Sequence, residues 1–271
     1  MEKIELKDID FSLNYELQMP TTNGFIYTCD DTRIKILTGL YEEDKQMLLD
    51  KFYALEKSDI PNIILPDQLI INNGELEGYV TKYPANSTMI GKRFIEGQFI
   101  DIHELIYAIK QASLVLRKLH EQELICQNAT LDNFVIDVSG NVFFSSVEGC
   151  KYLDYNYPYT SKLLKSFLVD YRQEKNFDIT KDTDKLSIIL STLYLFYLRE
   201  IKDISQRLYK RTSKKVQSLA QMEDLFKSLK NKKSVITNLP YVDELLEMDD
   251  CGYLNREEQF SLICRVLKKL S

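Results

Sequence analysis

Residues 119–136, LHEQELICQNATLDNFVI, join the end of a helix to a polar loop and a strand. A helix over residues 102–120 is predicted because apolar side chains recur at steps of four and three, at Leu105, Ile109, Ala112, Leu116 and Leu119. Phe134–Ile136 and Val142–Phe144 are apolar, and Gly140 between them suits a turn, so a β-hairpin follows the loop. The stretch therefore places polar residues between a helix and a hairpin.

The chain before this stretch is rich in predicted strands. β-branched and aromatic residues predict a hairpin over residues 24–37 and a second over residues 69–83, where Gly74 can take the positive φ of a turn. Between the hairpins, residues 41–57 have apolar side chains at helical spacing, and Pro61 follows. The order is hairpin, helix, hairpin.

Length and composition allow a large core. The chain has 271 residues, 44% of them hydrophobic, which suffices for one large domain or two lobes. Strands predominate up to residue 84. Helices predominate over residues 85–271, including a nearly all-apolar helix predicted at 184–197. We therefore expect an α+β fold in two parts, 1–84 and 85–271.

Charge and cysteine usage narrow the class of protein. The net charge of −6 makes nucleic acid an unlikely partner, because affinity for phosphate backbones comes largely from lysine and arginine. Five cysteines without a CxxC pair favour a reducing cytoplasm, and two histidines without a neighbouring cysteine pair predict no metal site. No apolar run reaches the roughly 18 residues that span a bilayer. A cytoplasmic protein without a transmembrane segment is expected.

The order of these elements resembles that of protein kinases, and so does the loop. Cys126-Gln127-Asn128, four residues and then Asn133 resemble the catalytic-loop pattern H-R-D-x-x-x-x-N. The resemblance implies a bilobal protein-kinase-like fold, with a small β-rich N-lobe over residues 1–84 and a larger helical C-lobe over 85–271. It also implies that Asn133 keeps the asparagine of the second magnesium site, although a loop asparagine that only turns the chain fits as well.

The same resemblance implies that catalysis is lost. Asn128 stands at the position of the catalytic aspartate, and an amide is not a useful base. Ser146-Val147-Glu148 occupies the place of D-F-G, and Ser146 cannot hold magnesium as the aspartate does. Glu148 reaches a metal only through a rearranged loop. Cys126 has no neighbouring base that would activate its thiol, so a small packed residue is expected there.

Lys35 is the expected remnant of a nucleotide site. Arg33-Ile34-Lys35-Ile36 resembles V-A-I-K, whose lysine neutralises ATP phosphates and pairs with a helix carboxylate. A lysine on the solvent face of an edge strand is the alternative.

The helix carboxylate expected to pair with Lys35 is Asp50, because it lies in the middle of the helix. Glu43 and Glu56 are the other candidates, and all three are alternatively solvated helix charges. Gly24 stands alone where a phosphate loop has three glycines. The resemblance thus implies that Lys35, Asp50 and Asn133 are remnants of a cofactor site. No cofactor is expected, and any ATP binding should be weak.

Two further features bear on the contacts of the chain. Asp184 resembles the aspartate that begins the central C-lobe helix and accepts hydrogen bonds from the catalytic-loop backbone, although an ordinary acid at a helix N-terminus fits equally.

The basic run 207–233 suggests an acidic protein partner, and a solvated helical face is the alternative. Its partner-facing candidates are Arg207, Lys210, Arg211, Lys214, Lys215, Lys230 and Lys232.

The functional hypothesis is a catalytically inactive kinase-like protein that acts as a regulatory or scaffolding binding module. The alternatives are a kinase-fold transferase or weak kinase with a rearranged nucleotide site, and a structural subunit of an assembly. Asn128 and Ser146 favour binding, because phosphoryl transfer depends on groups that they do not supply.

Overall fold

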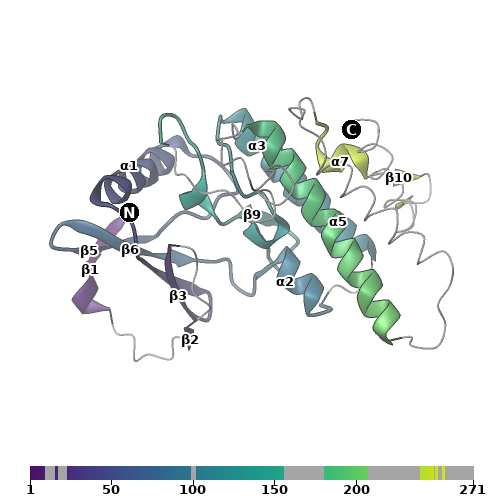
Figure 1. The fold of residues 1–271 in the computed structure, drawn as a ribbon, viewed down its shortest axis with the longest axis horizontal. Coiled ribbons are helices and arrows are strands. Elements are labelled where there is room, and N and C mark those ends of the chain that lie inside the picture. Colours follow the sequence, from purple (N-terminus) through teal and green to yellow (C-terminus); the bar gives the residue numbers. More distant parts are fainter. Residues whose placement is uncertain are drawn as a thin grey trace, which may run out of the picture.

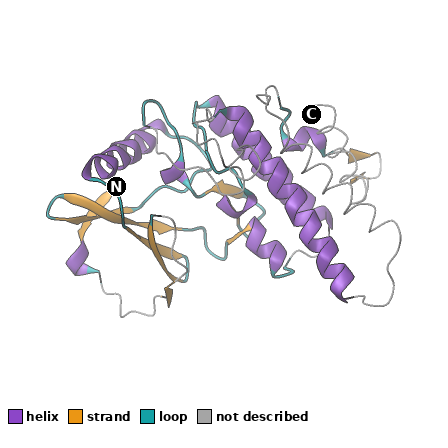
Figure 2. Ribbon diagram, viewed as in Figure 1, coloured by secondary structure: helices purple, strands orange, loops and turns teal. Residues whose placement is uncertain are grey.

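The computed structural model describes residues 1–9, 16–17, 23–98, 102–155, 180–206, 239–246, 248–249 and 252–253. It shows a mixed fold of a sheet with one helix, followed by helices with a smaller sheet (Figures 1 and 2). The expected α+β class is therefore confirmed.

A six-stranded sheet occupies the N-terminal part of the chain in the order β1-β5-β6-β4-β3-β2. Its strands are β1 (Glu2–Glu5), β2 (Glu16–Leu17), β3 (Gly24–Cys29), β4 (Thr32–Leu37), β5 (Gln68–Asn72) and β6 (Glu75–Lys82). Both predicted hairpins are confirmed, as the antiparallel pairs β3–β4 and β5–β6. β1 is followed by the short 3-10 helix η1 (Leu6–Asp8) and pairs parallel with β5.

Helix α1 (Glu42–Ser58) confirms the helix expected after the first hairpin. Its buried face carries Leu48, Phe52 and Leu55, which are spaced by four and three residues. The Phe52 ring meets Tyr79 of β6 edge-on, with centroids 5.3 Å apart. Burial of this face holds α1 against the sheet.

Strands β4 and β6 are brought together at a glycine. Lys35 pairs with Tyr79 and Ile36 with Gly78 across this ladder. A Cβ atom at Gly78 would lie 2.2 Å from the backbone oxygen of Lys35, closer than atoms can approach. Gly78 therefore permits the strand spacing that places Lys35 beside Tyr79.

The C-terminal part begins with β7 (Thr88–Met89) and α2 (Ile90–Ile95), followed by α3 (Ile102–Glu121). β7 joins the predicted hairpin, β8 (Phe134–Ile136) and β9 (Val142–Phe144), in a three-stranded sheet flanked by the 3-10 helices η2 (Leu131–Asn133) and η3 (Val147–Gly149). The buried helix expected at 184–197 is longer, as α5 (Lys181–Gln206). α7 (Val242–Leu245), β10 (Met248–Asp249) and β11 (Gly252–Tyr253) follow.

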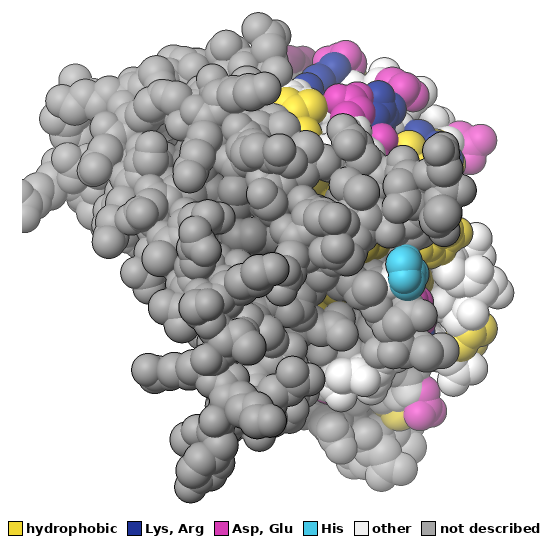
Figure 3. Space-filling view, turned by 90° about the vertical axis from the view of Figure 1, so that its right-hand side faces the viewer, with side chains coloured by type: hydrophobic (Ala, Val, Ile, Leu, Met, Phe, Trp, Pro, Cys, Tyr) yellow, Lys and Arg dark blue, Asp and Glu magenta, His cyan; other side chains and the backbone are white. Residues whose placement is uncertain are grey.

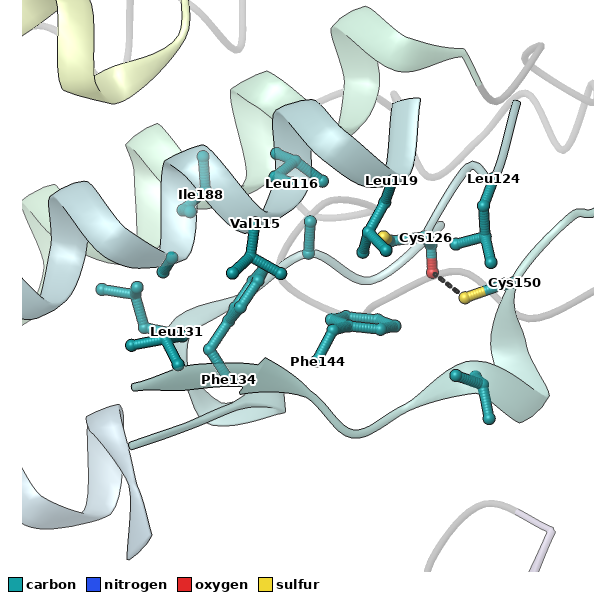
Figure 4. Close-up of a cluster of buried hydrophobic side chains, with 14 of the residues drawn as sticks. Val115, Leu116, Leu119, Leu124, Cys126, Leu131, Phe134, Phe144, Cys150 and Ile188 are labelled. Atoms are coloured by element: carbon teal, nitrogen blue, oxygen red, sulfur yellow. Dashed lines mark hydrogen bonds between the residues drawn. The ribbon is translucent and has the colours of Figure 1, made fainter. Parts of the chain in front are cut away.

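The core of this part fixes the stretch 119–136. Leu116 and Leu119 of α3, Phe144 of β9 and Ile188 of α5 are completely buried, and they lie around the loop in Figure 4. The rings of Phe134 and Phe144 meet edge-on at 5.3 Å. The polar loop thus has apolar packing on both of its flanks, which limits its movement.

Candidate functional site

A cluster of charged and polar side chains lies where the six-stranded sheet meets the segment after β9. Lys35 comes from β4, and Tyr79 lies directly opposite it on β6, so both side chains project from the same face. Glu148 belongs to η3, whose backbone follows the β8–β9 hairpin. Three segments that are distant in sequence therefore supply one cluster.

The carboxylate of Glu148 is shared by donors from the sheet. Lys35 forms an ion pair with Oε1, and the Tyr79 hydroxyl donates to Oε2 at 2.5 Å. Asn23 adds a side-chain hydrogen bond to Glu148 and accepts one from Lys35 at 2.8 Å. Burial alone would raise the pKa of Glu148, but Lys35 and the two neutral donors outweigh it and lower the pKa. Glu148 is therefore ionised at neutral pH.

The helix residue at this cluster is Lys51, which is only 1% exposed. Its ammonium donates hydrogen bonds to the backbone oxygens of Glu148 and Cys150, the latter at 2.9 Å. Desolvation by burial lowers the pKa of Lys51 to about 8, against the opposing effects of Cys150 and Glu148. Lys51 thus remains mainly protonated at pH 7 and ties α1 to the backbone of residues 148–150.

The expected pairing of Lys35 with Asp50 is wrong, because the structure pairs Lys35 with Glu148. Asp50 instead accepts a hydrogen bond at 2.8 Å from Gln46, one turn earlier on α1. Successive helix residues differ by about 100° in direction, so the turn that brings Lys51 to the cluster takes Asp50 away from it. A nucleotide-binding role for Asp50 has no support from this geometry.

Asp184 anchors the loop that begins at Cys126. Its Oδ2 accepts the backbone N–H of Cys126 at 2.5 Å and lies 3.0 Å from Nε2 of His120. The expected contact between Asp184 and the loop backbone is therefore confirmed. Burial raises the pKa of Asp184, and His120 with the loop N–H groups offsets only part of that effect. The other ring nitrogen of His120 lies 2.9 Å from the Tyr241 hydroxyl.

Asn128 and Asn133 are brought together at the two ends of the loop. Nδ2 of Asn133 donates to the backbone oxygen of Asn128 at 2.8 Å. The backbone oxygen of Asn133 accepts the N–H of Ser145 at 2.9 Å, next to Ser146 at the start of η3. Asn133 thus has a loop-stabilising role, the alternative that its sequence context left open. Its part in binding a metal or nucleotide stays a prediction.

Three members of the cluster, Lys51, Tyr79 and Asn23, were not singled out from the sequence. Lys51 had a signal, because it shares the apolar stripe of Leu48, Phe52 and Leu55 at helical spacing. Tyr79 and Asn23 have no such local signal. Their place depends on strand register, which links residues far apart in the chain.

The described residues contain neither a cluster of metal-ligand side chains nor a helix suited to crossing a bilayer. Among them, no group of three or more histidine, cysteine, aspartate or glutamate side chains is arranged to hold a metal ion. None of the described helices is both long and apolar enough to span a bilayer.

The basic run 207–233, with all its partner-facing candidates, lies outside the described residues. On the face drawn in Figure 3, the described lysine and arginine side chains are interspersed with acidic ones. The described side chains visible there therefore form no separate basic patch, and a partner at the basic run stays a prediction.

Comparison with known proteins assigns no family to the chain. The sequence matches no protein-family model, and no curated protein matches it. The cluster around Glu148 and the anchored loop 126–133 are therefore the features from which a function can be inferred.

Proposed function

We propose that this chain is a catalytically inactive protein-kinase-like protein that acts as a regulatory or scaffolding binding module. The arrangement that supports this proposal is a strand-rich part with one helix, joined to a helical part that contains a hairpin. The anchoring of the Cys126 backbone by Asp184 at the start of α5 supports it further. The bilobal kinase-like fold is part of the proposal.

The main support for this proposal is that Glu148, a residue of the same chain, neutralises the charge of Lys35. In a kinase, the corresponding lysine must be available to the phosphates of ATP. Here the Lys35 side chain is only 7% exposed and pairs with Glu148, which replaces the negative charge of a phosphate. A nucleotide would have to displace a carboxylate held by two further donors, Tyr79 and Asn23. Such a displacement leaves a buried charge unpaired and is therefore unfavourable.

The helix at the cluster gives a second reason. A kinase places a carboxylate on this helix to orient the lysine. α1 instead presents the ammonium of Lys51, whose hydrogen bonds go to backbone oxygens of the chain itself. Asn128 and Ser146 supply neither the base nor the metal-binding carboxylate of phosphoryl transfer. A role in binding a protein partner fits these features better than catalysis.

A thermal-shift titration with ATP, with and without magnesium or manganese, tests this proposal. Ligand binding to the native state raises the melting temperature by mass action. We expect no metal-dependent shift, because Glu148 remains paired with Lys35. A magnesium-dependent rise of several degrees at millimolar ATP would overturn the proposal.

A weak kinase or transferase with a rearranged nucleotide site is the second candidate. It is favoured by one observation, that η3 does supply a carboxylate, Glu148, two positions after Ser146, which stands at the place of the metal-binding aspartate of D-F-G. On this reading, magnesium and ATP stabilise the wild type and fail to stabilise Glu148→Gln. The variant Glu75→Gln is the matched control, since that carboxylate lies far along the sheet in a half-exposed pair with Lys45.

A further inference from the structure

Cys126 and Cys150 face each other across a short antiparallel bridge. Ile125 and Lys151 exchange both backbone hydrogen bonds, at 2.9 and 2.8 Å. The next facing pair in an antiparallel ladder makes no backbone hydrogen bonds and has its Cα atoms about 4.5 Å apart. That pair is Cys126 and Cys150.

The Cys150 thiol already contacts the backbone of Cys126. Its Sγ lies 3.8 Å from the backbone oxygen of Cys126. Figure 4 shows the Cys150 side chain directed toward Cys126. Disulfides join residues whose Cα atoms are about 4.4–6.8 Å apart, a range that includes the separation of about 4.5 Å of such a facing pair in a regular ladder.

We propose that Cys126 and Cys150 form a reversible disulfide and are a redox modification site of this protein. Both cysteines are free thiols in the structure, and both side chains are completely buried. The bond would join the start of the 126–133 loop to the segment just after Glu148. In a reducing compartment, such disulfides are transient and serve redox sensing.

The two thiols have different surroundings. The Lys51 ammonium donates to the backbone oxygen of Cys150, so a positive charge stands beside this residue. Burial raises the pKa of the Cys126 thiol, which keeps its proton. Cys150 is therefore the attacking residue and Cys126 the resolving one.

The reaction needs a two-electron oxidant, and a hydroperoxide such as hydrogen peroxide supplies it. The Cys150 sulfur attacks one peroxide oxygen, the O–O bond breaks, and the leaving hydroxide departs as water with the Cys150 proton. This step gives a sulfenic acid on Cys150. The Cys126 sulfur then attacks that sulfur, the S–O bond breaks, and a second water leaves with the Cys126 proton. Two thiols lose two electrons, and one peroxide becomes two waters.

Peptide mapping without reductant tests the proposal directly. The variant Cys29→Ser/Cys251→Ser/Cys264→Ser retains only the facing pair. After brief treatment of this folded variant with hydrogen peroxide, we expect one cross-linked peptide pair lacking two hydrogens, which dithiothreitol separates. Sulfinic acid at either cysteine without the cross-link would overturn the proposal. A cross-link that forms only in urea would also overturn it, because the folded contact would then be irrelevant.

A stability measurement on the wild-type chain supplies a second readout. The disulfide closes a loop between residues 24 positions apart, which restricts the unfolded chain. Peroxide should therefore raise the melting temperature of the wild type, and dithiothreitol should reverse the rise. The same treatment should leave Cys150→Ser unchanged, whereas Cys29→Ser should behave as the wild type. An equal rise in Cys150→Ser would show that another site is responsible and would refute the assignment.

Discussion

Replacement of Lys51 by methionine should alter the pH dependence of folding more than it alters stability at neutral pH. The side chain is 1% exposed, and burial lowers its pKa from 10.5 to about 8. At about 1.4 kcal/mol per pKa unit, this shift means that the native state bears a cost of about 3 kcal/mol for holding the charge at pH 7. Methionine is similar in length and flexible enough to fill the same space.

Removing the buried charge should stabilise the native state, but losing the hydrogen bonds of Lys51 should destabilise it. Methionine leaves the backbone oxygens of Glu148 and Cys150 without this donor, and an unsatisfied buried carbonyl costs about 1–3 kcal/mol. The two effects nearly cancel, so the variant should lie within about 2 kcal/mol of the wild type at pH 7.

The pH dependence has a definite sign. In the unfolded chain Lys51 keeps its proton up to about pH 10.5, whereas in the native state it loses the proton near pH 8. The unfolded state therefore binds more protons between these values, and the stability of the native state rises with pH across this window. From pH 7 to pH 10, Lys51 should add roughly 2–3 kcal/mol to the free energy of unfolding of the wild type relative to the variant.

Urea unfolding at pH 7, 8, 9 and 10 measures this difference. Ionisation of the tyrosines and of the cysteines other than Cys150 affects both proteins alike, so the difference between the two curves reports Lys51 together with its neighbour Cys150. Lys57→Met, at an exposed position of the same helix, controls for the loss of one positive charge, and its curve should run parallel to that of the wild type. A constant difference between wild type and Lys51→Met from pH 7 to 10 would refute the reasoning.

Two further substitutions test the cluster and the strand spacing that positions it. Glu148→Gln should lower the free energy of unfolding by about 3 kcal/mol, because it leaves the buried Lys35 charge unpaired, while Glu75→Gln should cost less than about 1 kcal/mol in its exposed pair. Equal losses in urea unfolding would contradict the cluster. Gly78→Ala should cost about 2–3 kcal/mol, since its Cβ would meet the Lys35 backbone oxygen at 2.2 Å, and an unchanged melting temperature would contradict that packing.

Local periodicity was sufficient to predict most elements of the fold. The hairpins β3–β4, β5–β6 and β8–β9 each have apolar runs on either side of a turn, and α1 and α3 have apolar side chains at helical spacing. β1 was not predicted, because it is a four-residue strand with a mainly exposed burial pattern. Its position depends on parallel pairing with β5, more than sixty residues away, and no local pattern encodes that contact.

The site was predicted only where one strand or one loop determines it. Lys35 and the Asn128–Asn133 loop follow from local motifs, whereas Asp50 was chosen among three helix carboxylates for its place in the middle of the helix. The buried face of the helix, marked by Leu48 and Phe52, was a better guide. It places Lys51, the residue after Asp50, toward the core. The partner of Lys35 could not be derived locally, since Glu148 is 113 residues away.

Two lysines from different elements, Lys35 and Lys51, both bind the segment that contains η3. Lys35 holds the side chain of Glu148 to β4, while Lys51 holds the backbone of Glu148 and Cys150 to α1. A displacement of η3 therefore breaks contacts with the sheet and with the helix at once. Because Cys150 faces Cys126, the same displacement also changes the distance between the two thiols. A binding partner that moves η3 should therefore change the rate at which the proposed disulfide between Cys126 and Cys150 forms.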